Sequence, residues 1–271
     1  MRPPKIIFAL LIFASLPVFG QGLSREQVKD TVHDMPVFSM YEDNYFMTGI
    51  PLHRGISKTT ADAKYQISFK YLLTRNTLPY DSYLFFTYTQ KAFWDIYDKS
   101  LPFNEINFNP GINLGIPVFK KDELLGMAFL KAEHESNGRD SIYSRSWNRI
   151  SLAFHMHTGK RSTLSVEAWF PFRYKKDNPE LIDYAGFGEL NYSYELQPEK
   201  WTLDVRLQKG GNWDWKGSVR TRLLYSPFAM KRINLMLEWY YGYAESLIAF
   251  QQLRSMVRVG FMFRSDELNF L

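Results

Sequence analysis

The 271-residue sequence contains no cysteine, and this absence excludes several kinds of site. Without thiols the chain can form no disulfide scaffold, no zinc–cysteine site, no iron–sulfur cluster and no cysteine nucleophile. After residue 20 it also lacks an apolar run of about 18 residues, the length that a membrane-spanning helix requires. The net charge of +5 is too small to indicate nucleic-acid binding. Aromatic residues, in contrast, make up 17% of the chain, more than an ordinary soluble domain needs.

The first twenty residues have the features of a secretory signal peptide. Arg2 and Lys5 give a positive start, and the apolar stretch that follows is too short to span a bilayer. Small residues precede a plausible cleavage site before Gln21. A buried hydrophobic helix is the alternative. We expect residues 1–20 to be removed, which lowers the net charge from +5 to +3 and leaves a secreted or outer-membrane protein.

Alternation of apolar and polar residues with period 2 dominates the rest of the chain. Tyr65, Ile67 and Phe69, for example, alternate with Gln66 and Ser68. The polar face carries charged residues in mid-segment, which a packed soluble core would reject, and the segments run to about ten residues, against a usual five or six. Apolar side chains outside and polar side chains inside are typical of a transmembrane β-barrel. A secreted soluble β-protein is the alternative.

Twelve such segments are expected, and an even number fits a bacterial barrel. They lie at 44–52, 64–74, 82–94, 103–117, 124–136, 146–158, 163–174, 186–197, 200–209, 216–226, 232–243 and 255–265. The sequence therefore predicts an all-β fold, a 12-stranded antiparallel transmembrane β-barrel over residues 44–271. Residues 21–43 would form a periplasmic arm or a lumen-facing segment. With both chain ends in the periplasm, the stretches 95–101, 137–145 and 175–183 would share the outer rim.

Three polar side chains are expected to meet on the outer wall just below that rim. The even positions from Leu124 to His134 are apolar or small until His134 itself, so the even face of this segment is predicted to face lipid. His134 and Ser136 then share that face. If the hairpin is symmetric about Ser141, Asn148 lies directly opposite His134, with Cβ atoms about 5 Å apart.

This trio has the composition of a catalytic triad. Ser136 would be the nucleophile, His134 the base, and Asn148 the group that orients the imidazole. On the outer wall at headgroup depth such a site can meet only lipid, so the substrate would be the acyl ester of a phospholipid or lysophospholipid. A polar girdle at the membrane interface, with no chemistry, is the alternative.

The stretch HESNGRDSIYSRSWNR at 134–149 closely resembles the signature of the outer-membrane phospholipase A family. Further matches are YTQKAFW at 88–94, SLPFNEINFNP at 100–110, DNP at 177–179 and YGYAESLI at 241–248. The resemblance implies a twelve-stranded barrel in the bacterial outer membrane whose active site faces the outer leaflet. It also implies calcium-dependent A1, A2 and lysophospholipase activity, with a homodimer as the active form.

The resemblance further assigns residues to a calcium site and to the oxyanion. Ser144 and the backbone carbonyl of Arg139 would bind Ca²⁺, and the partner subunit's Ser100 would complete the site. Asp177 matches a carboxylate linked to calcium in the monomeric form. The Gly138 amide would stabilise the oxyanion together with the ion. The segment at 95–101 that carries Ser100 is shorter than in the family, which weakens the assignment of Ser100 as a calcium ligand.

Two further residues matter for this interpretation. Gln90 matches a glutamine at the dimer seam of the family, although lumen-facing polarity would also explain it. Glu135 stands between His134 and Ser136 and is expected to point into the lumen, where it would not disturb the triad.

Two other functions remain open for a barrel of this kind. A non-enzymatic porin could use the charged lumen residues as a pathway, but their mixed signs favour a salt-bridged interior, and channel conductance would discriminate. A barrel protease would be expected to use carboxylates at the outer rim and a water-borne substrate. The lipid-facing direction of His134 argues against it.

Overall fold

The computed structural model describes residues 22–75, 77–227 and 233–265. The signal peptide expected at 1–20 lies outside these residues. The elements are α2 (Arg25–Asp34), β1 (Phe38–Ser39), β2 (Asn44–Pro51), β3 (Asp62–Leu72), η2 (Pro79–Asp81), β4 (Tyr83–Trp94), β5 (Phe103–Lys120), β6 (Glu123–Ser136), η3 (Ser141–Tyr143), β7 (Ser146–Gly159), β8 (Ser162–Phe172), α3 (Leu181–Ala185), β9 (Gly188–Gln197), β10 (Trp201–Lys209), β11 (Gly217–Tyr225), β12 (Ile233–Gly242) and β13 (Arg254–Phe263).

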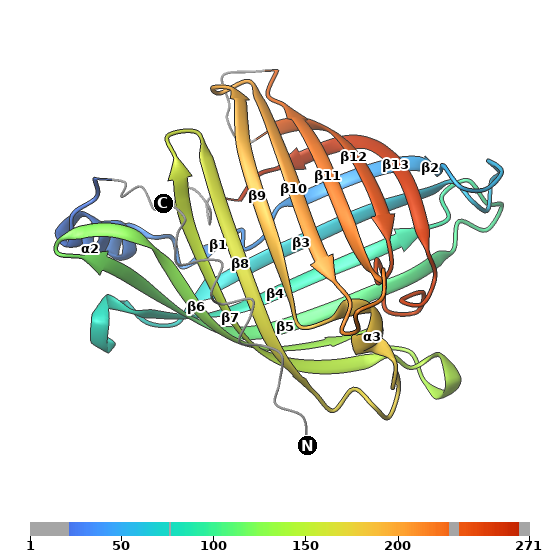
Figure 1. Ribbon diagram of the computed structural model, residues 1–271, viewed down its shortest axis with the longest axis horizontal. Coiled ribbons are helices and arrows are strands. Elements are labelled where there is room, and N and C mark those ends of the chain that lie inside the picture. The colour runs from blue at the N-terminus through green and yellow to red at the C-terminus, as the bar shows by residue number, and fades with distance from the viewer. Residues whose placement is uncertain (1–21, 76, 228–232, 266–271) are drawn as a thin grey trace.

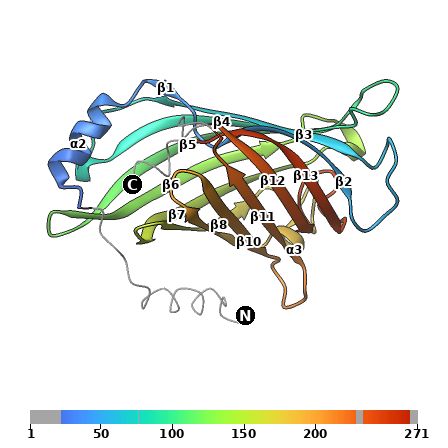
Figure 2. The same cartoon turned by 90° about the horizontal axis from the view of Figure 1, so that it is seen from above.

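The long strands β2 to β13 form a closed antiparallel barrel, which confirms the predicted fold class (Figures 1 and 2). Each strand pairs with its neighbours in sequence, and β13 pairs with β2 to close the circle. Each expected segment overlaps one of these strands. The short β1 adds to the far end of β3. Among the described helices, none has the length and apolarity to cross a membrane.

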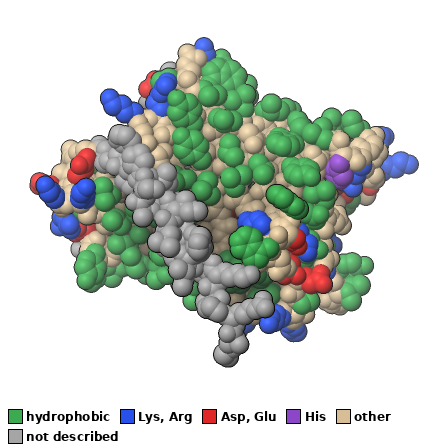
Figure 3. Space-filling view, viewed as in Figure 1, with side chains coloured by type: hydrophobic (Ala, Val, Ile, Leu, Met, Phe, Trp, Pro, Cys, Tyr) green, Lys and Arg blue, Asp and Glu red, His purple; other side chains and the backbone are tan. Residues whose placement is uncertain are grey.

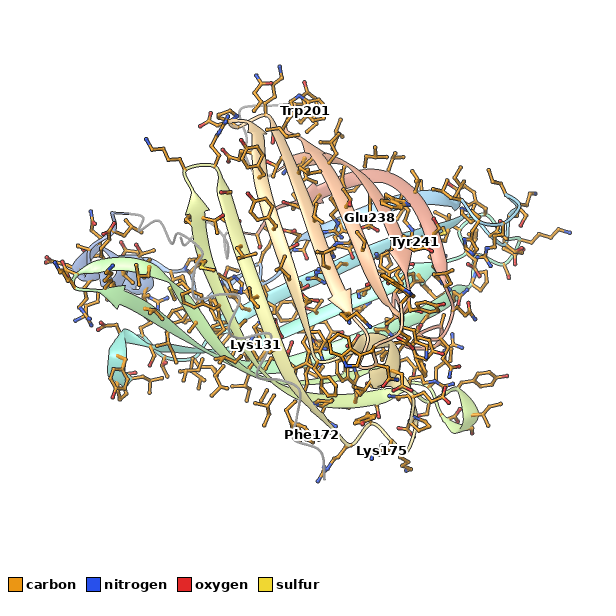
Figure 4. The ribbon with its side chains drawn as sticks, viewed as in Figure 1. Lys131, Phe172, Lys175, Trp201, Glu238 and Tyr241 are labelled. Carbon is orange, nitrogen blue, oxygen red and sulfur yellow. The ribbon has the colours of Figure 1, made fainter. Side chains whose placement is uncertain are left out.

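The side chains are arranged with apolar groups outside and charged groups inside, the reverse of a soluble protein. Alternate positions of β12 show this: Glu238 is fully buried in the lumen, whereas Leu237 and Tyr241 are 44% and 46% exposed on the wall. Hydrophobic side chains accordingly cover much of the surface in Figure 3. Figure 4 shows Lys131 and Glu238 within the barrel and Phe172 at its edge. An exposed apolar wall of this extent fits a lipid environment.

The two ends of the barrel differ. One end, here called the loop rim, consists of the connections at 52–61, 95–102, 137–145, 173–187, 210–216 and 243–253. The other end, the turn rim, has two- and three-residue turns at 121–122, 160–161 and 198–200. The stretches expected to share one rim all belong to the loop rim.

The arm before the barrel contains a helix that the sequence analysis did not predict. Helix α2 begins with a capping box, in which the Ser24 hydroxyl accepts from the Gln27 amide and the Gln27 side chain accepts from the Ser24 amide. It buries Val28 and Val32 against Phe85 and neighbouring apolar residues inside the barrel. The arm therefore helps to close the lumen near the turn rim.

One prediction of the side to which a residue points was wrong. Leu124 was assigned to the lipid face with the other even positions of its segment, yet its side chain is fully buried in the cluster that contains Val28. The register between β5 and β6 shifts at this point, because Val118 pairs with Gly126 while Phe119 pairs with Leu124. The bulge at Leu125 reverses the alternation for the residues before it.

Candidate active site

The strand register brings His134 and Asn148 together as the symmetric hairpin predicts. They are direct partners across β6 and β7, and His134 Nδ1 lies 3.0 Å from Asn148 Oδ1. An amide oxygen can only accept, so this contact requires a proton on Nδ1 and leaves the Nε2 lone pair free. His134 is exposed on the outer wall, where a base can meet a lipid-borne group.

Ser136 is the last residue of β6 and lies opposite Ser146. It shares the outward face with His134, two positions along the strand. Within the described residues no hydrogen bond joins its hydroxyl to the imidazole. Hydrogen bonds between catalytic groups are often longer before substrate binds. The arrangement is therefore compatible with Ser136 as the nucleophile and His134 as its base.

The lumen side of the same hairpin is held by charged contacts. Glu135 points inward, as predicted, and its carboxylate accepts from Trp147 Nε1 at 3.0 Å and from Arg149 at 3.2 Å. Arg149 also makes a two-pronged contact with Glu133 at 2.9 and 3.2 Å. These contacts fix β6 against β7 directly behind the triad, which restricts the relative movement of His134 and Asn148.

The loop after Ser136 is organised by Asn137, a residue that sequence reasoning missed. Its side chain is 4% exposed. Its Oδ1 accepts from the amides of Arg139 at 3.3 Å and Arg145 at 3.0 Å, and its Nδ2 donates to the Tyr143 carbonyl at 2.9 Å. One side chain thus holds both ends of the loop. The Asn-Gly pair at 137–138 was the available signal, because Asn and Gly favour such turns.

Gly138 occupies a conformation that favours glycine. Its φ is +63°, and a Cβ built there would lie 3.0 Å from Phe108 Cε2. A second missed residue, Asn109, donates from its side chain to the His134 carbonyl at 3.0 Å. That contact comes from the neighbouring strand β5, so no pattern local to the signature could have indicated it.

The loop that follows β8 places Asp177 next to the β6–β7 hairpin of the triad. Its carboxylate accepts from the Ser146 hydroxyl at 2.9 Å, and the adjacent Asn178 accepts from the Ser146 amide at 3.0 Å. Since Ser146 lies opposite Ser136, both loops converge on the end of the triad hairpin.

The residues assigned to calcium divide into those near the triad and one apart from it. Arg139 and Ser144 belong to the loop held by Asn137, and the Ser144 hydroxyl makes no hydrogen bond within the described residues. Hydroxyl, carbonyl and carboxylate oxygens suit a hard cation such as Ca²⁺. Ser100 lies in the separate 95–102 loop and makes no described contact with them. The described residues contain no cluster of three His, Asp or Glu side chains that could hold a metal ion, so a calcium site formed by Arg139 and Ser144 would depend on neutral oxygens and water.

Comparison with known proteins matches the chain to phospholipases. The family model described as phospholipase A1 matches residues 25–263. Phospholipase A1 from Escherichia coli K12 is 32% identical over 210 residues, which cover 74% of this chain and 69% of that protein. Phospholipase A1 from Proteus vulgaris is 29% identical over an alignment of 286 positions, which covers 93% of this chain and 96% of that protein. The chain spans about half, 54%, of the length of a Neisseria meningitidis relative that is 31% identical.

Solved structures agree with the sequence matches. The chain resembles the Salmonella typhi outer membrane phospholipase, crystallised as a dimer with bound calcium, with a TM-score of 0.77 and 25% identity over 88% of this chain and 97% of that one. It resembles outer membrane phospholipase A from Escherichia coli with a TM-score of 0.74 and 27% identity over 85% of this chain and 99% of that one.

Proposed function

Since the chain belongs to the phospholipase A1 family, we propose that it is an outer-membrane enzyme that hydrolyses the acyl esters of phospholipids and lysophospholipids. The His134–Asn148 contact on a lipid-facing wall is the observation that carries the proposal. Residues 1–20 would be a signal peptide, 21–43 a periplasmic arm and 44–271 the catalytic barrel. The loop rim would face the outside, so the triad would meet lipids of the outer leaflet.

The first step is acyl transfer to Ser136. Its oxygen bonds to the ester carbonyl carbon while His134 Nε2 takes the hydroxyl proton, and Asn148 holds the resulting imidazolium through Nδ1–H. The C–O bond to the glycerol oxygen then breaks, and that oxygen takes the proton from His134. A water molecule, deprotonated by the same nitrogen, attacks the acyl-enzyme; the bond to the Ser136 oxygen breaks, that oxygen takes the proton from His134, and a fatty acid is released. The mechanism does not discriminate between A1, A2 and lysophospholipid esters.

The negative charge on the tetrahedral intermediate needs stabilisation in this partly apolar setting. The Gly138 amide stands two residues from Ser136 and is the backbone donor proposed for this oxyanion. Ser144 and the Arg139 carbonyl would hold Ca²⁺ next to it, and Asp177 would bind calcium in the monomeric form. Bound calcium would add positive charge near the oxyanion.

We further propose that the active form is a homodimer with the barrels side by side. Gln90 faces the outer wall, where its amide oxygen accepts from Tyr88 at 3.0 Å, and its cross-strand partner Ile67 is 52% exposed. A mid-wall amide in contact with lipid is costly, so a second subunit that offers hydrogen bonds would stabilise it. In such a dimer the partner subunit's Ser100 could reach the calcium site.

A porin function is less well supported. The lumen contains a cavity of about 260 Å³ lined by charges of both signs. Apolar clusters lie on either side of it: one includes Val28 and Val32 of α2, and the other packs Leu181 and Ile182 of α3 against Trp169. An interior closed in this way favours a structural role for the charges over conduction.

Fatty-acid release from mixed phospholipid micelles tests the proposal. We expect wild-type protein to release fatty acid with calcium and not with EDTA, and Ser136→Ala to be inactive in both. Ser165→Ala, a lumen-facing serine on β8, is the matched control. Fatty-acid release by Ser136→Ala would contradict the assignment of the triad. Equal rates of lipid hydrolysis by crosslinked monomer and dimer would contradict the proposal that the dimer is the active form.

A further inference from the structure

Two connections of the loop rim carry most of the positive charge around the triad. They are the loop at 137–145 and the first part of the connection after β8, at 173–180; together they are called the basic loops. Their cationic side chains are Arg139, Arg145, Arg173, Lys175 and Lys176. Their acidic side chains are Asp140, Asp177 and Glu180, so the basic loops have a net positive charge.

The basic loops are fixed beside the triad. Phe172, the residue before the second loop, lies opposite Asn148 across β7 and β8. His134, Asn148 and Phe172 therefore form one row on the outer wall. The contacts of Ser146 with Asp177 and Asn178 hold the second loop to the triad strand. Figure 4 shows Phe172 and Lys175 along the same edge of the barrel.

The cations of the basic loops have no carboxylate partners within the part of the chain that is described. Arg145 donates to the carbonyls of Ile142 and Ser144 at 2.9 and 2.7 Å, and Arg139 donates to the Asn104 carbonyl. Carbonyl oxygens satisfy donors without cancelling their charge. The loop at 210–216 is different, because there Asp214 lies 3.1 Å from Lys216.

The orientation of a bound lipid would bring its phosphate to these loops. Below the row of His134, Asn148 and Phe172, the outer wall is apolar: Ile150 and Phe170 are opposite each other and are 48% and 70% exposed. An acyl chain whose ester is at Ser136 would lie along this wall, in the hydrocarbon. The headgroup must then extend the other way, towards water and the basic loops.

Given the hydrolysis proposed above, on which this inference rests, we propose that the basic loops form a headgroup subsite that binds the lipid phosphate and selects anionic over zwitterionic phospholipids. Guanidinium and ammonium groups bind phosphate through charge-assisted hydrogen bonds. A zwitterionic headgroup brings an ammonium group into the same positive field, and the resulting repulsion offsets part of the attraction. An anionic headgroup, such as phosphatidylglycerol, has no such group.

The test compares initial rates on phosphatidylglycerol and phosphatidylcholine with the same acyl chains. Each lipid is present at the same low mole fraction in neutral detergent micelles, with saturating calcium. We expect the wild-type protein to hydrolyse phosphatidylglycerol faster by about fivefold or more, since exposed charges contribute modestly each. The ratio should fall towards one in 0.5 M salt, which screens exposed charges.

The variant is Lys175→Gln with Lys176→Gln, two exposed residues outside the proposed catalytic and calcium-binding set. It should bring the ratio close to one and leave the phosphatidylcholine rate within about twofold, because only the exposed charge is removed. Lys160→Gln, an exposed lysine in the turn at the opposite end of the β7–β8 hairpin, should keep the wild-type ratio. An unchanged ratio in the double variant, or a wild-type ratio of one, overturns the subsite.

A binding measurement separates this inference from the proposed hydrolysis. Ser136→Ala protein in EDTA is equilibrated with each lipid, and bound lipid is counted by native mass spectrometry. Preferential binding of phosphatidylglycerol that is lost with both lysine substitutions supports the subsite even if no lipid is hydrolysed; the hydrolysis alone would then be wrong. Equal binding of the two lipids contradicts the subsite, whatever the activity.

Discussion

At the scale of single residues, the proposed chemistry depends on the imidazole of His134 being held in one tautomer. The 3.0 Å contact with Asn148 is the only described hydrogen bond of this ring, so nothing else in the described chain fixes its orientation. A neutral amide is a weaker partner for an imidazolium than a carboxylate would be. The triad is therefore sensitive to the group at position 148.

Asn148→Ala should lower kcat by about 10- to 100-fold, which corresponds to a loss of about 1.4–2.7 kcal/mol of transition-state stabilisation. Asn148→Asp should retain more activity than the alanine variant, since a carboxylate oxygen also accepts from Nδ1–H. Fatty-acid release at saturating substrate measures both. Asn191→Ala, a lumen-lining asparagine on β9, is the control. Wild-type kcat in Asn148→Ala would show that this contact has no part in catalysis.

The residues of the proposed site were predictable to different degrees. His134 and Asn148 could be paired from sequence because strand alternation and hairpin symmetry are local rules. Asn137 and Asn109 could not, since their contacts depend on the path of a loop and on the register of a neighbouring strand.

At the scale of elements, the loop after β6 sets the position of the proposed oxyanion donor. Asn137 ties its two ends together, so a change within the loop cannot be relieved by displacement of the whole loop. Gly138 is the tightest point, because its φ of +63° and its approach to Phe108 both disfavour a side chain.

Gly138→Ala should reduce kcat by about 10- to 100-fold, since the added methyl group shifts the amide that faces the oxyanion. The left-handed conformation should cost about 1 kcal/mol, too little to unfold the barrel. Steady-state kinetics and the heat-dependent gel mobility of the barrel separate these effects. Gly55→Ala is the matched control, because Gly55 lies in another rim loop with no atom within 4 Å of its built Cβ. Normal kinetics in Gly138→Ala would exclude its amide from the reaction.

The strands themselves were predictable because each alternates over about ten residues, which is long enough for period 2 to stand out. Alternation fails where a residue is inserted, as the buried side chain of Leu124 shows. Helix α2 was missed because its apolar face consists chiefly of Val28 and Val32, four positions apart in an otherwise polar segment.

At the scale of the whole molecule, a buried ion-pair network lies near the β13–β2–β3 seam, where the barrel closes. Arg258 is fully buried on β13 and contacts Asp62 of β3 twice at 2.8 Å. It also contacts Glu245 of the 243–253 loop at 2.7 Å. Lys64 joins Glu245 at 3.0 Å and Glu238 of β12 at 3.2 Å. The sequence predicted a salt-bridged interior but could not pair these charges, because the partners are up to 196 residues apart.

The pKa of Glu245 makes this network sensitive to acid. Burial alone would raise it, but Arg258, Lys64 and Arg254 together lower the pKa from its ordinary 4.5 to about 2. A carboxyl group whose pKa is lower in the folded state stabilises that state above the unfolded pKa. The stabilisation is therefore present above about pH 4.5 and is lost as the pH falls towards 2.

Arg258→Met should destabilise the barrel by about 3–5 kcal/mol, because it leaves the buried Asp62 carboxylate without its described ion-pair partner. Glu245→Gln is the milder variant, since Asp62 still pairs with Arg258 in its presence. The difference in unfolding free energy between wild type and Glu245→Gln should be constant above pH 5 and shrink between about pH 4.5 and 2. Guanidinium unfolding in detergent micelles, followed by tryptophan fluorescence, measures it. Arg54→Met, in an exposed rim loop, controls for loss of a positive charge. A pH-independent difference would mean that Glu245 contributes through packing and not through its charge.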